Sequence, residues 1–203
     1  MEKIDFRKEF KELYSPPSTG FTEVVVPPMN FLMIDGCGDP NTAPAYAAAI
    51  EALYSVAYVL KFASKLEQDR DYVVPPLEGL WWVDDMASFA TAAKADWQWT
   101  MMIMQPAWIT AEMVAVALRV ARLKKLSTAL ELLRYEQLEE GRSVQIMHVG
   151  PYADEAPTIA RLHAEYLPQH GLVPTGKHHE IYLGDPRKTE PSKLKTVLRQ
   201  PVR

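Results

Sequence analysis

Residues 178–183 read HHEIYL, a pattern typical of a β-strand, in which successive side chains point to opposite faces. One face then carries His178, Glu180 and Tyr182. Ile181 points to the other face, where it can pack on a helix. The Glu180 carboxylate needs water, a hydrogen-bond donor or a cation, because burial without a partner is costly. Two interpretations remain open: Glu180 meets solvent on a half-exposed strand, or it faces a ligand pocket.

The composition is that of an ordinary globular protein. The chain has 203 residues, 48% hydrophobic and 24% charged, which is enough for a sizeable core. The net charge of −4 argues against a nucleic-acid binder and is compatible with a neutral or cationic ligand. Cys37 is the only cysteine, so no internal disulfide can form and a reducing cytoplasm is expected. We expect neither a signal peptide nor a membrane span, because no uninterrupted apolar run approaches about 18 residues.

Residue patterns predict both strands and helices. The expected strands are residues 22–26, 30–35, 72–74, 77–83, 97–104, 143–149, 178–183 and 194–199. The expected helices are residues 43–64, 111–124, 128–139 and 154–171. The helix at 128–139 opens on TALE, a capping-box pattern, and Asp154 is expected to cap the last helix.

The two ends of the chain repeat one plan of strand, helix, strand and strand. The first copy ends on MIMQP at 102–106 and the second on VLRQP at 197–201. This duplication predicts an α+β fold in which two strand–helix–strand–strand modules share one antiparallel sheet of about eight strands. A two-helix insertion is expected between the copies. The expected divisions are an N-terminal arm at 1–20 and a single domain at 21–203, made of a first module at 21–107, the insertion at 108–140 and a second module at 141–203.

Aligning the copies predicts a ligand-binding floor on the sheet, opposite the long helices. Glu78 then matches His178, and Trp82 matches Tyr182. With Glu180, the floor would carry two carboxylates, two large aromatic side chains and a histidine. This depends on strand register, because a shift by one residue turns every side chain to the other face. The alternative is that Trp82 and its neighbour are simply core residues.

Several chemistries are discounted. Cys37 lies in a glycine-rich turn with no helix placed to activate it as a nucleophile. A metal would need ligands beyond His178 and Glu180, such as His148. The chain contains no Gly-x-Ser-x-Gly motif and no phosphate-binding loop. We therefore expect neither a metal nor a cofactor.

Three segments occur in a characteristic order: PLEGLWW at 76–82, HVGPY at 148–152 and HHEIYL at 178–183. The last two resemble the gyrase-inhibitor-like (GyrI-like) small-molecule-binding domain family. The first, with the helical insertion, is similar to its stand-alone branch, which includes cyclopropanoid cyclopropyl hydrolases that open cyclopropane-bearing DNA alkylators with an aromatic cage. The resemblance covers residues 22–202 and implies two fused strand–helix–strand–strand modules around a pocket.

The resemblance also implies an acidic residue that faces the pocket from the strand before the last, which is Glu180 here. Other members of the family carry a winged-helix DNA-binding domain and act as drug-sensing regulators. This chain has no room for such a domain, so direct nucleic-acid binding is not expected.

Three functions remain open: a hydrolase of strained xenobiotics, a protein that sequesters or senses flat, hydrophobic and often cationic drugs, and an adaptor that binds a protein partner through the insertion. In the hydrolase, aromatic side chains stack on the substrate, Glu180 orients or deprotonates a water, and a tyrosine hydroxyl stabilises the developing oxyanion. Glu78 is then its partner or a substitute base. The predicted catalytic residues are Glu180 and Tyr152, and the predicted ligand-binding residues are Trp82, Tyr182, Glu78, Tyr54, Tyr46 and His178.

Overall fold

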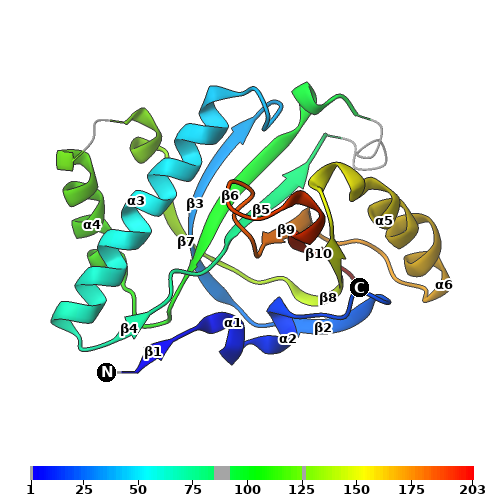
Figure 1. Ribbon diagram of the computed structural model, residues 1–203, viewed down its shortest axis with the longest axis horizontal. Helices are drawn as coiled ribbons and strands as arrows, with labels where there is room; N and C mark the ends of the chain where they lie inside the picture. The colour runs from blue at the N-terminus through cyan, green and yellow to red at the C-terminus, as the bar shows by residue number, and fades with distance from the viewer. Residues whose placement is uncertain (1, 85–91, 125–126) are drawn as a thin grey trace.

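A curled antiparallel sheet of eight strands carries the fold of the computed structural model, which describes residues 2–84, 92–124 and 127–203 (Figure 1). The strands lie in the order β2-β8-β10-β9-β5-β6-β3-β7, and each pairs antiparallel with its neighbours. Their bounds are β2 Thr22–Val26, β3 Met29–Cys37, β5 Leu77–Trp82, β6 Gln98–Gln105, β7 Arg134–Leu138, β8 Gly141–Val149, β9 His178–Tyr182 and β10 Lys195–Pro201. The predicted α+β fold is confirmed.

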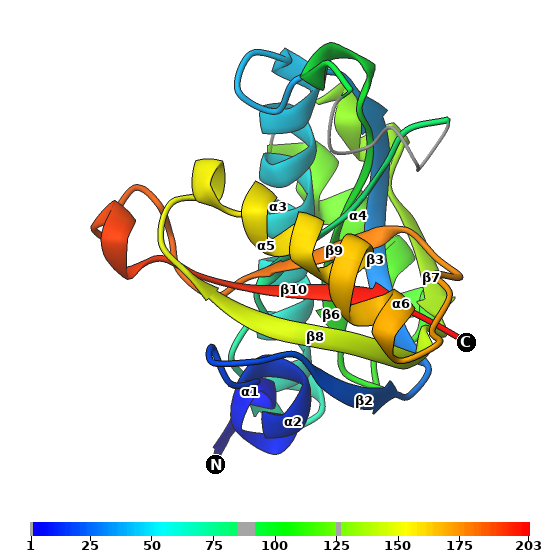
Figure 2. The same ribbon diagram turned by 90° about the vertical axis from the view of Figure 1, so that its right-hand side faces the viewer.

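The sheet is built from two similar halves. From the centre of the sheet outward, the strands of the first half are β5, β6 and β3, and those of the second half are β9, β10 and β8. Along the chain, each half begins with its outer strand, continues with its helical segment, and then returns to its central strand. Figure 2 shows β8 and β10 crossing in front of the more upright strands of the first half. The duplicated module is therefore the unit of architecture, and β5 and β9 meet where the two copies join.

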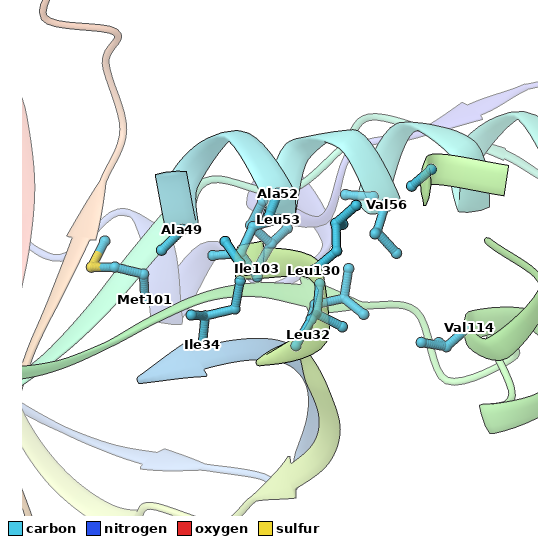
Figure 3. Packing of buried hydrophobic residues seen from close by; sticks show 14 of the residues in the cluster. Leu32, Ile34, Ala49, Ala52, Leu53, Val56, Met101, Ile103, Val114 and Leu130 are labelled. Carbon is cyan, nitrogen blue, oxygen red and sulfur yellow. The ribbon is translucent and has the colours of Figure 1, made fainter. Parts of the chain in front are cut away.

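The main core lies between the first half of the sheet and the helix α3 (Pro44–Glu67) (Figure 3). This segment is alanine-rich and opens on Pro44, whose missing N–H costs nothing in a first helical turn. Its buried residues include Ala49, Leu53, Val56 and Leu60, spaced three and four apart. By length and hydropathy α3 could also cross a membrane. Its buried stripe instead packs on the sheet, as in the core helix of a folded domain.

The insertion differs from the prediction. Its first helix is present as α4 (Ala111–Lys124), which packs on α3. The predicted helix at 128–139 is wrong: a short 3-10 turn at Thr128–Glu131 is followed by β7, which pairs with β3. The capping-box residues do begin a helical turn, but the open edge of β3 offers backbone partners that a helix would leave unpaired. Tyr135 secures the strand by donating a hydrogen bond of 2.7 Å to the carbonyl of Ile109.

The helical segment of the second half is broken into short pieces. A 3-10 turn at Tyr152–Asp154 precedes α5 (Ala156–Arg161), and a π-helical turn at Leu162–Tyr166 leads into α6 (Leu167–Gln169). The π turn comes just before Pro168, whose missing N–H removes a helical hydrogen bond. The N-cap of α5 is Glu155, so the prediction that Asp154 caps this helix is wrong.

The N-terminal arm packs on the sheet face opposite α3. Its short elements are β1 (Lys3–Ile4), α1 (Phe6–Glu9) and α2 (Lys11–Tyr14). The strand β1 pairs parallel with β4 (Asp71–Tyr72). Leu13 and Tyr14 of α2 are buried against Ile181 of β9 and Val197 of β10. The arm therefore covers part of the face that was expected to form the ligand floor.

Candidate functional site

The pairing of β5 with β9 decides which side chains share a face with Glu180. Gly79 lies directly opposite Glu180, and directly paired residues of antiparallel strands point to the same side. Trp81, two residues on, therefore lies on the Glu180 face, whereas Glu78 and Trp82 point to the other face. The predicted alignment of the two copies was shifted by one residue, and that shift turned the side chains over.

A chain of hydrogen bonds holds the Glu180 carboxylate. The Trp81 Nε1–H donates to the Tyr182 hydroxyl oxygen over 2.9 Å, and the Tyr182 hydroxyl donates to Glu180 Oε2 over 2.7 Å. Glu180 Oε1 lies 3.4 Å from Nε2 of the fully buried His178. Glu180 itself is 9% exposed. Two donors in series thus fix one carboxylate oxygen, while the other faces a histidine.

Gly79 makes this arrangement possible. A Cβ at this position would lie 2.8 Å from Trp81 Nε1 and 3.2 Å from the Tyr182 hydroxyl oxygen. Such approaches are too close for ordinary packing, so the indole and the phenol can meet only above a residue without a side chain.

Aromatic rings from both halves surround the carboxylate. Tyr46 of α3 lies 6.0 Å from Trp81 between ring centroids, and Tyr152 lies 5.5 Å from Tyr182, edge to face. Burial raises the pKa of Tyr46, and the negative charge of Glu180 raises it further. The pKa of Tyr152 is raised to about 12, by burial first and then by nearby carboxylates. The site therefore lies on the helix-bearing face, and not opposite the long helices as expected.

Tyr54 of α3 lies farther out than Tyr46. Burial raises its pKa, and Tyr58 and Asp185 contribute to the same direction. Its ring lies beside that of Tyr58, tilted by 30°, with 6.3 Å between the ring centroids. Tyr54 makes a small contribution to the raised pKa of Tyr152, so we assign Tyr54 to the edge of the site.

Glu155 is a member of the site that sequence reasoning missed. It opens α5, is only 4% exposed, and within the described part of the chain its Oε1 has no hydrogen-bond partner. Burial raises its pKa to about 9, and the charge of Glu180 adds to this effect. A glutamate at the start of a helix is ordinarily solvated and interacts favourably with the helix dipole. The only sequence signal for Glu155 was therefore its position three residues after Tyr152.

We call Tyr46, Trp81, Tyr152, Glu155, His178, Glu180 and Tyr182 the Glu180 cluster. It contains four of the predicted ligand-binding or catalytic residues besides Glu180, with Tyr54 at its edge. Two cavities of about 600 and 340 Å³ are lined by other residues, the first beneath the arm and the second on the face of Leu80.

Glu78 belongs to a buried charge network on the opposite face. Its Oε1 accepts a hydrogen bond of 3.3 Å from the Tyr14 hydroxyl, and its Oε2 lies 2.9 Å from His179 Nε2. The other ring nitrogen of His179 lies 2.9 Å from Glu140, which also pairs with Arg199 over 3.1 Å. Burial alone would lower the pKa of His179, but Glu140 and Glu78 outweigh it and raise that pKa to about 9. These contacts tie Glu78 to the fold and leave it outside the Glu180 cluster.

Trp82 also lies outside the cluster. It packs with Leu80 and Met102 on the face opposite α3. The ammonium of Lys177 lies 3.1 Å from the centroid of its ring, so this ring already holds a cation of the chain itself. Within the described residues, no group of three or more histidine, cysteine, aspartate or glutamate side chains is arranged to hold a metal ion.

Solved structures from Listeria innocua are similar to the whole chain. An uncharacterized conserved protein from this organism is 43% identical, with a TM-score of 0.90, over 99% of this chain and 100% of that one. A protein described as a hydrolase from the same organism is 42% identical, with a TM-score of 0.85 and the same coverage. The C-terminal domain of EcmrR is 10% identical, with a TM-score of 0.57 over 91% of this chain and 97% of that one, which shows a shared fold alone.

The comparison with curated proteins found no match. The model of the GyrI-like small molecule binding domain matches residues 21–203, which is most of the chain. The match includes both copies of the duplicated module and every residue of the Glu180 cluster. The chain therefore belongs to the GyrI-like small molecule binding domain family.

Proposed function

We propose that this protein is a hydrolase that opens strained, electrophilic rings of flat xenobiotics, with Glu180 as the general base. The observation that carries the proposal is the Glu180 carboxylate, oriented by Tyr182 and Trp81 inside a group of aromatic side chains. Membership of a small-molecule-binding family supports a small ligand, and relatives above 40% identity are described as hydrolases. A cytoplasmic location, expected from the single cysteine, fits a role in detoxification.

The cluster favours one class of ligand. The rings of Tyr46, Tyr152 and Tyr182 offer flat apolar surfaces on which an aromatic molecule can stack. Their electron-rich faces and the Glu180 charge attract a cationic centre, or the positive character that develops at an attacked carbon. We therefore expect planar, hydrophobic molecules that are neutral or cationic, and poor binding of anions.

A cyclopropane joined to a cyclohexadienone is a suitable electrophile. Glu180 takes a proton from a water molecule whose oxygen bonds to a ring CH₂ carbon, and one carbon–carbon bond of the cyclopropane breaks. The bonding electrons move to the carbonyl oxygen, so the dienone becomes a phenol. A base positioned in this way contributes about 10²–10⁴-fold to the rate. Tyr152, whose raised pKa keeps its hydroxyl protonated, is the donor proposed to stabilise the developing oxyanion.

A drug-sequestering protein is the second candidate, because the same aromatic rings and carboxylate would bind a cationic drug without any turnover. The adaptor hypothesis retains only α4 as its surface, on which Val116 and Leu123 remain exposed. No observation identifies what would cover them.

The decisive experiment incubates the protein with the parent spiro-cyclopropyl cyclohexadienone and follows, by mass spectrometry, formation of a product heavier by one water. Glu180→Gln should retain binding of this neutral compound and lose about 10²–10⁴-fold in turnover. If Glu180→Gln turned over at the native rate, Glu180 would not be the base. Binding by the native protein without any product would favour the sequestering function.

Trp81 and Trp82 provide a matched pair of controls, since adjacent tryptophans point to opposite faces of β5. Trp81→Phe removes the donor to Tyr182 and should weaken both binding and turnover. Trp82→Phe should bind and react as the native protein does. Equal effects of the two substitutions would contradict the placement of the site on the helix-bearing face.

A further inference from the structure

We infer that Glu155 is the general acid of this site, and that its protonated carboxyl gives a proton to the oxygen that becomes negative as the ring opens. This inference rests on the proposed function and adds a catalytic residue to it. The residue comes from the second half of the fold, at the start of α5, whereas Glu180 comes from the sheet.

The surroundings of Glu155 are those of a neutral carboxyl. Only 4% of the residue is exposed, and its Oε1 has no hydrogen-bond partner among the described residues. Although Glu155 is the N-cap of α5, its side chain makes no capping hydrogen bond. An ionised carboxylate in this position would lose its hydration and gain only the contact with the Thr196 hydroxyl, whose lowering effect on the Glu155 pKa is smaller than the raising effect of burial. Burial therefore retains the proton on Glu155.

Glu155 is electrostatically coupled to the rest of the cluster. For the raised pKa of Tyr152, burial is the largest cause and the charge of an ionised Glu155 is the second. The same charge makes a smaller contribution to the raised pKa of Tyr182. The Glu180 charge in turn helps burial raise the Glu155 pKa to about 9. Two carboxyl groups that share a buried site cannot both ionise at low cost, so the pair holds one proton at neutral pH.

Hydrogen bonding decides which carboxyl keeps that proton. Glu180 Oε2 accepts a hydrogen bond of 2.7 Å from the Tyr182 hydroxyl, and a hydrogen bond of this kind stabilises an ionised carboxylate. Among the described residues Glu155 Oε1 has no hydrogen-bond partner, and the Thr196 hydroxyl, which lowers the Glu155 pKa, acts against the larger effect of burial. Two carboxyls in different environments thus take different roles, with Glu180 as base and Glu155 as acid.

The reaction balances with these two groups and one water. Glu180 accepts a proton from water as the new carbon–oxygen bond forms, and the cyclopropane carbon–carbon bond breaks. Its electron pair reaches the carbonyl oxygen, which takes the proton of Glu155 and becomes a phenol. Glu180 is then protonated and Glu155 ionised, and transfer of one proton from Glu180 to Glu155 restores the starting state. No oxidant or reductant is required.

The first test locates the proton without any substrate. Infrared difference spectroscopy of the native protein at about pH 7 should show the C=O stretch of a protonated carboxyl, which disappears on titration near pH 9. The band should be absent from Glu155→Gln. In Glu180→Gln, where the neighbouring charge is removed, it should disappear at a lower pH. Persistence of the band in Glu155→Gln, or its absence from the native protein, would overturn the inference.

The second test measures the acid role on the spiro-cyclopropyl cyclohexadienone and on ring-substituted analogues that release more acidic phenols. Glu155→Gln should lose about 10²–10⁴-fold in kcat with little change in KM, and the loss should shrink as the phenol becomes more acidic. The native rate should fall above about pH 9, and the variant should lack this alkaline limb. The exposed Glu165→Gln, from the same helical segment, should behave as native.

If Glu155→Gln lost the same factor in kcat for every phenol, or kept the fall in rate above about pH 9, the proton would come from another group and the inference would be overturned. Failure of the native protein to hydrolyse any of these compounds would reject the proposed function and the acid role with it. The infrared result would still decide which carboxyl holds the proton, so the two failures are distinguishable.

Discussion

We expect the free energy of unfolding to decrease as the pH rises from about 6.5 to about 9, because His179 is charged in the folded protein. Its ring is fully buried, and its two nitrogens lie 2.9 Å from Glu78 and 2.9 Å from Glu140. The pKa of His179 rises from an ordinary 6.5 to about 9. A difference of one in pKa corresponds to about 1.4 kcal/mol, so the charged form contributes about 3 kcal/mol.

The sign follows from proton linkage. His179 binds its proton more tightly in the folded chain, so its contribution is complete below its unfolded pKa of 6.5 and is lost as the pH rises through about 9. The same contacts act on Glu140. Burial alone would raise its pKa, but His179 and Arg199 lower it to about 2. Stability from Glu140 is therefore present above its unfolded pKa of 4.5 and lost as the pH falls through about 2. The two contributions describe one interaction and are not added.

The assay is urea unfolding followed by tryptophan fluorescence at several pH values between about 5.5 and 9.5. His179→Gln keeps a donor and an acceptor but no charge, and should lose about 3–5 kcal/mol at about pH 6, where it leaves the carboxylates without their cation. Its stability should vary much less than the native value above about pH 6.5. His170→Gln replaces an exposed histidine and should follow the native curve. A native stability that stays constant up to about pH 9.5 would refute the charged state of His179.

Three further substitutions and one control test packing and the site. Leu53→Ala, in the centre of the α3 core, should cost about 2–5 kcal/mol in urea unfolding, because it leaves a cavity under a fully buried side chain. Gly36→Ala should cost at least about 1–3 kcal/mol, since its Cβ would lie 2.1 Å from the ring of Trp99, whereas Gly20→Ala, with open space around it, should be nearly neutral. Tyr182→Phe removes a hydrogen bond worth about 1.5–3 kcal/mol to the Glu180 carboxylate, and should lower turnover at least about tenfold in the ring-opening assay while the protein remains folded.

Most strands could be predicted because their signals are local. Apolar runs between glycines and prolines predicted residues 22–26 as a strand with the observed bounds, and six of the other strands of the large sheet within a few residues. The repeated order of elements predicted the shared sheet. The segment 128–139 was misread, because its helical turn is local whereas its strand exists only through pairing with β3. Backbone partners supplied by another part of the chain outweighed a weak local preference.

The residues of the candidate site also divide into those that local sequence predicts and those that the pairing of distant strands determines. Alternation along β9 predicted from sequence that His178, Glu180 and Tyr182 share a face, since side chains alternate on any strand. The residue that meets them from β5 depends on the pairing of two distant segments, and a change of one position exchanges Trp82 for Trp81.

Local sequence patterns thus predicted most of the strands, the duplication of the module and the chemistry carried by β9. The register of β5 against β9 and the burial of Glu155 follow from contacts between distant segments, which the sequence does not show. Periodicity is a property of consecutive residues, whereas register and burial depend on which distant segments meet. A carboxyl at the start of α5 holds its proton because the folded chain buries it and brings it under the influence of the Glu180 charge.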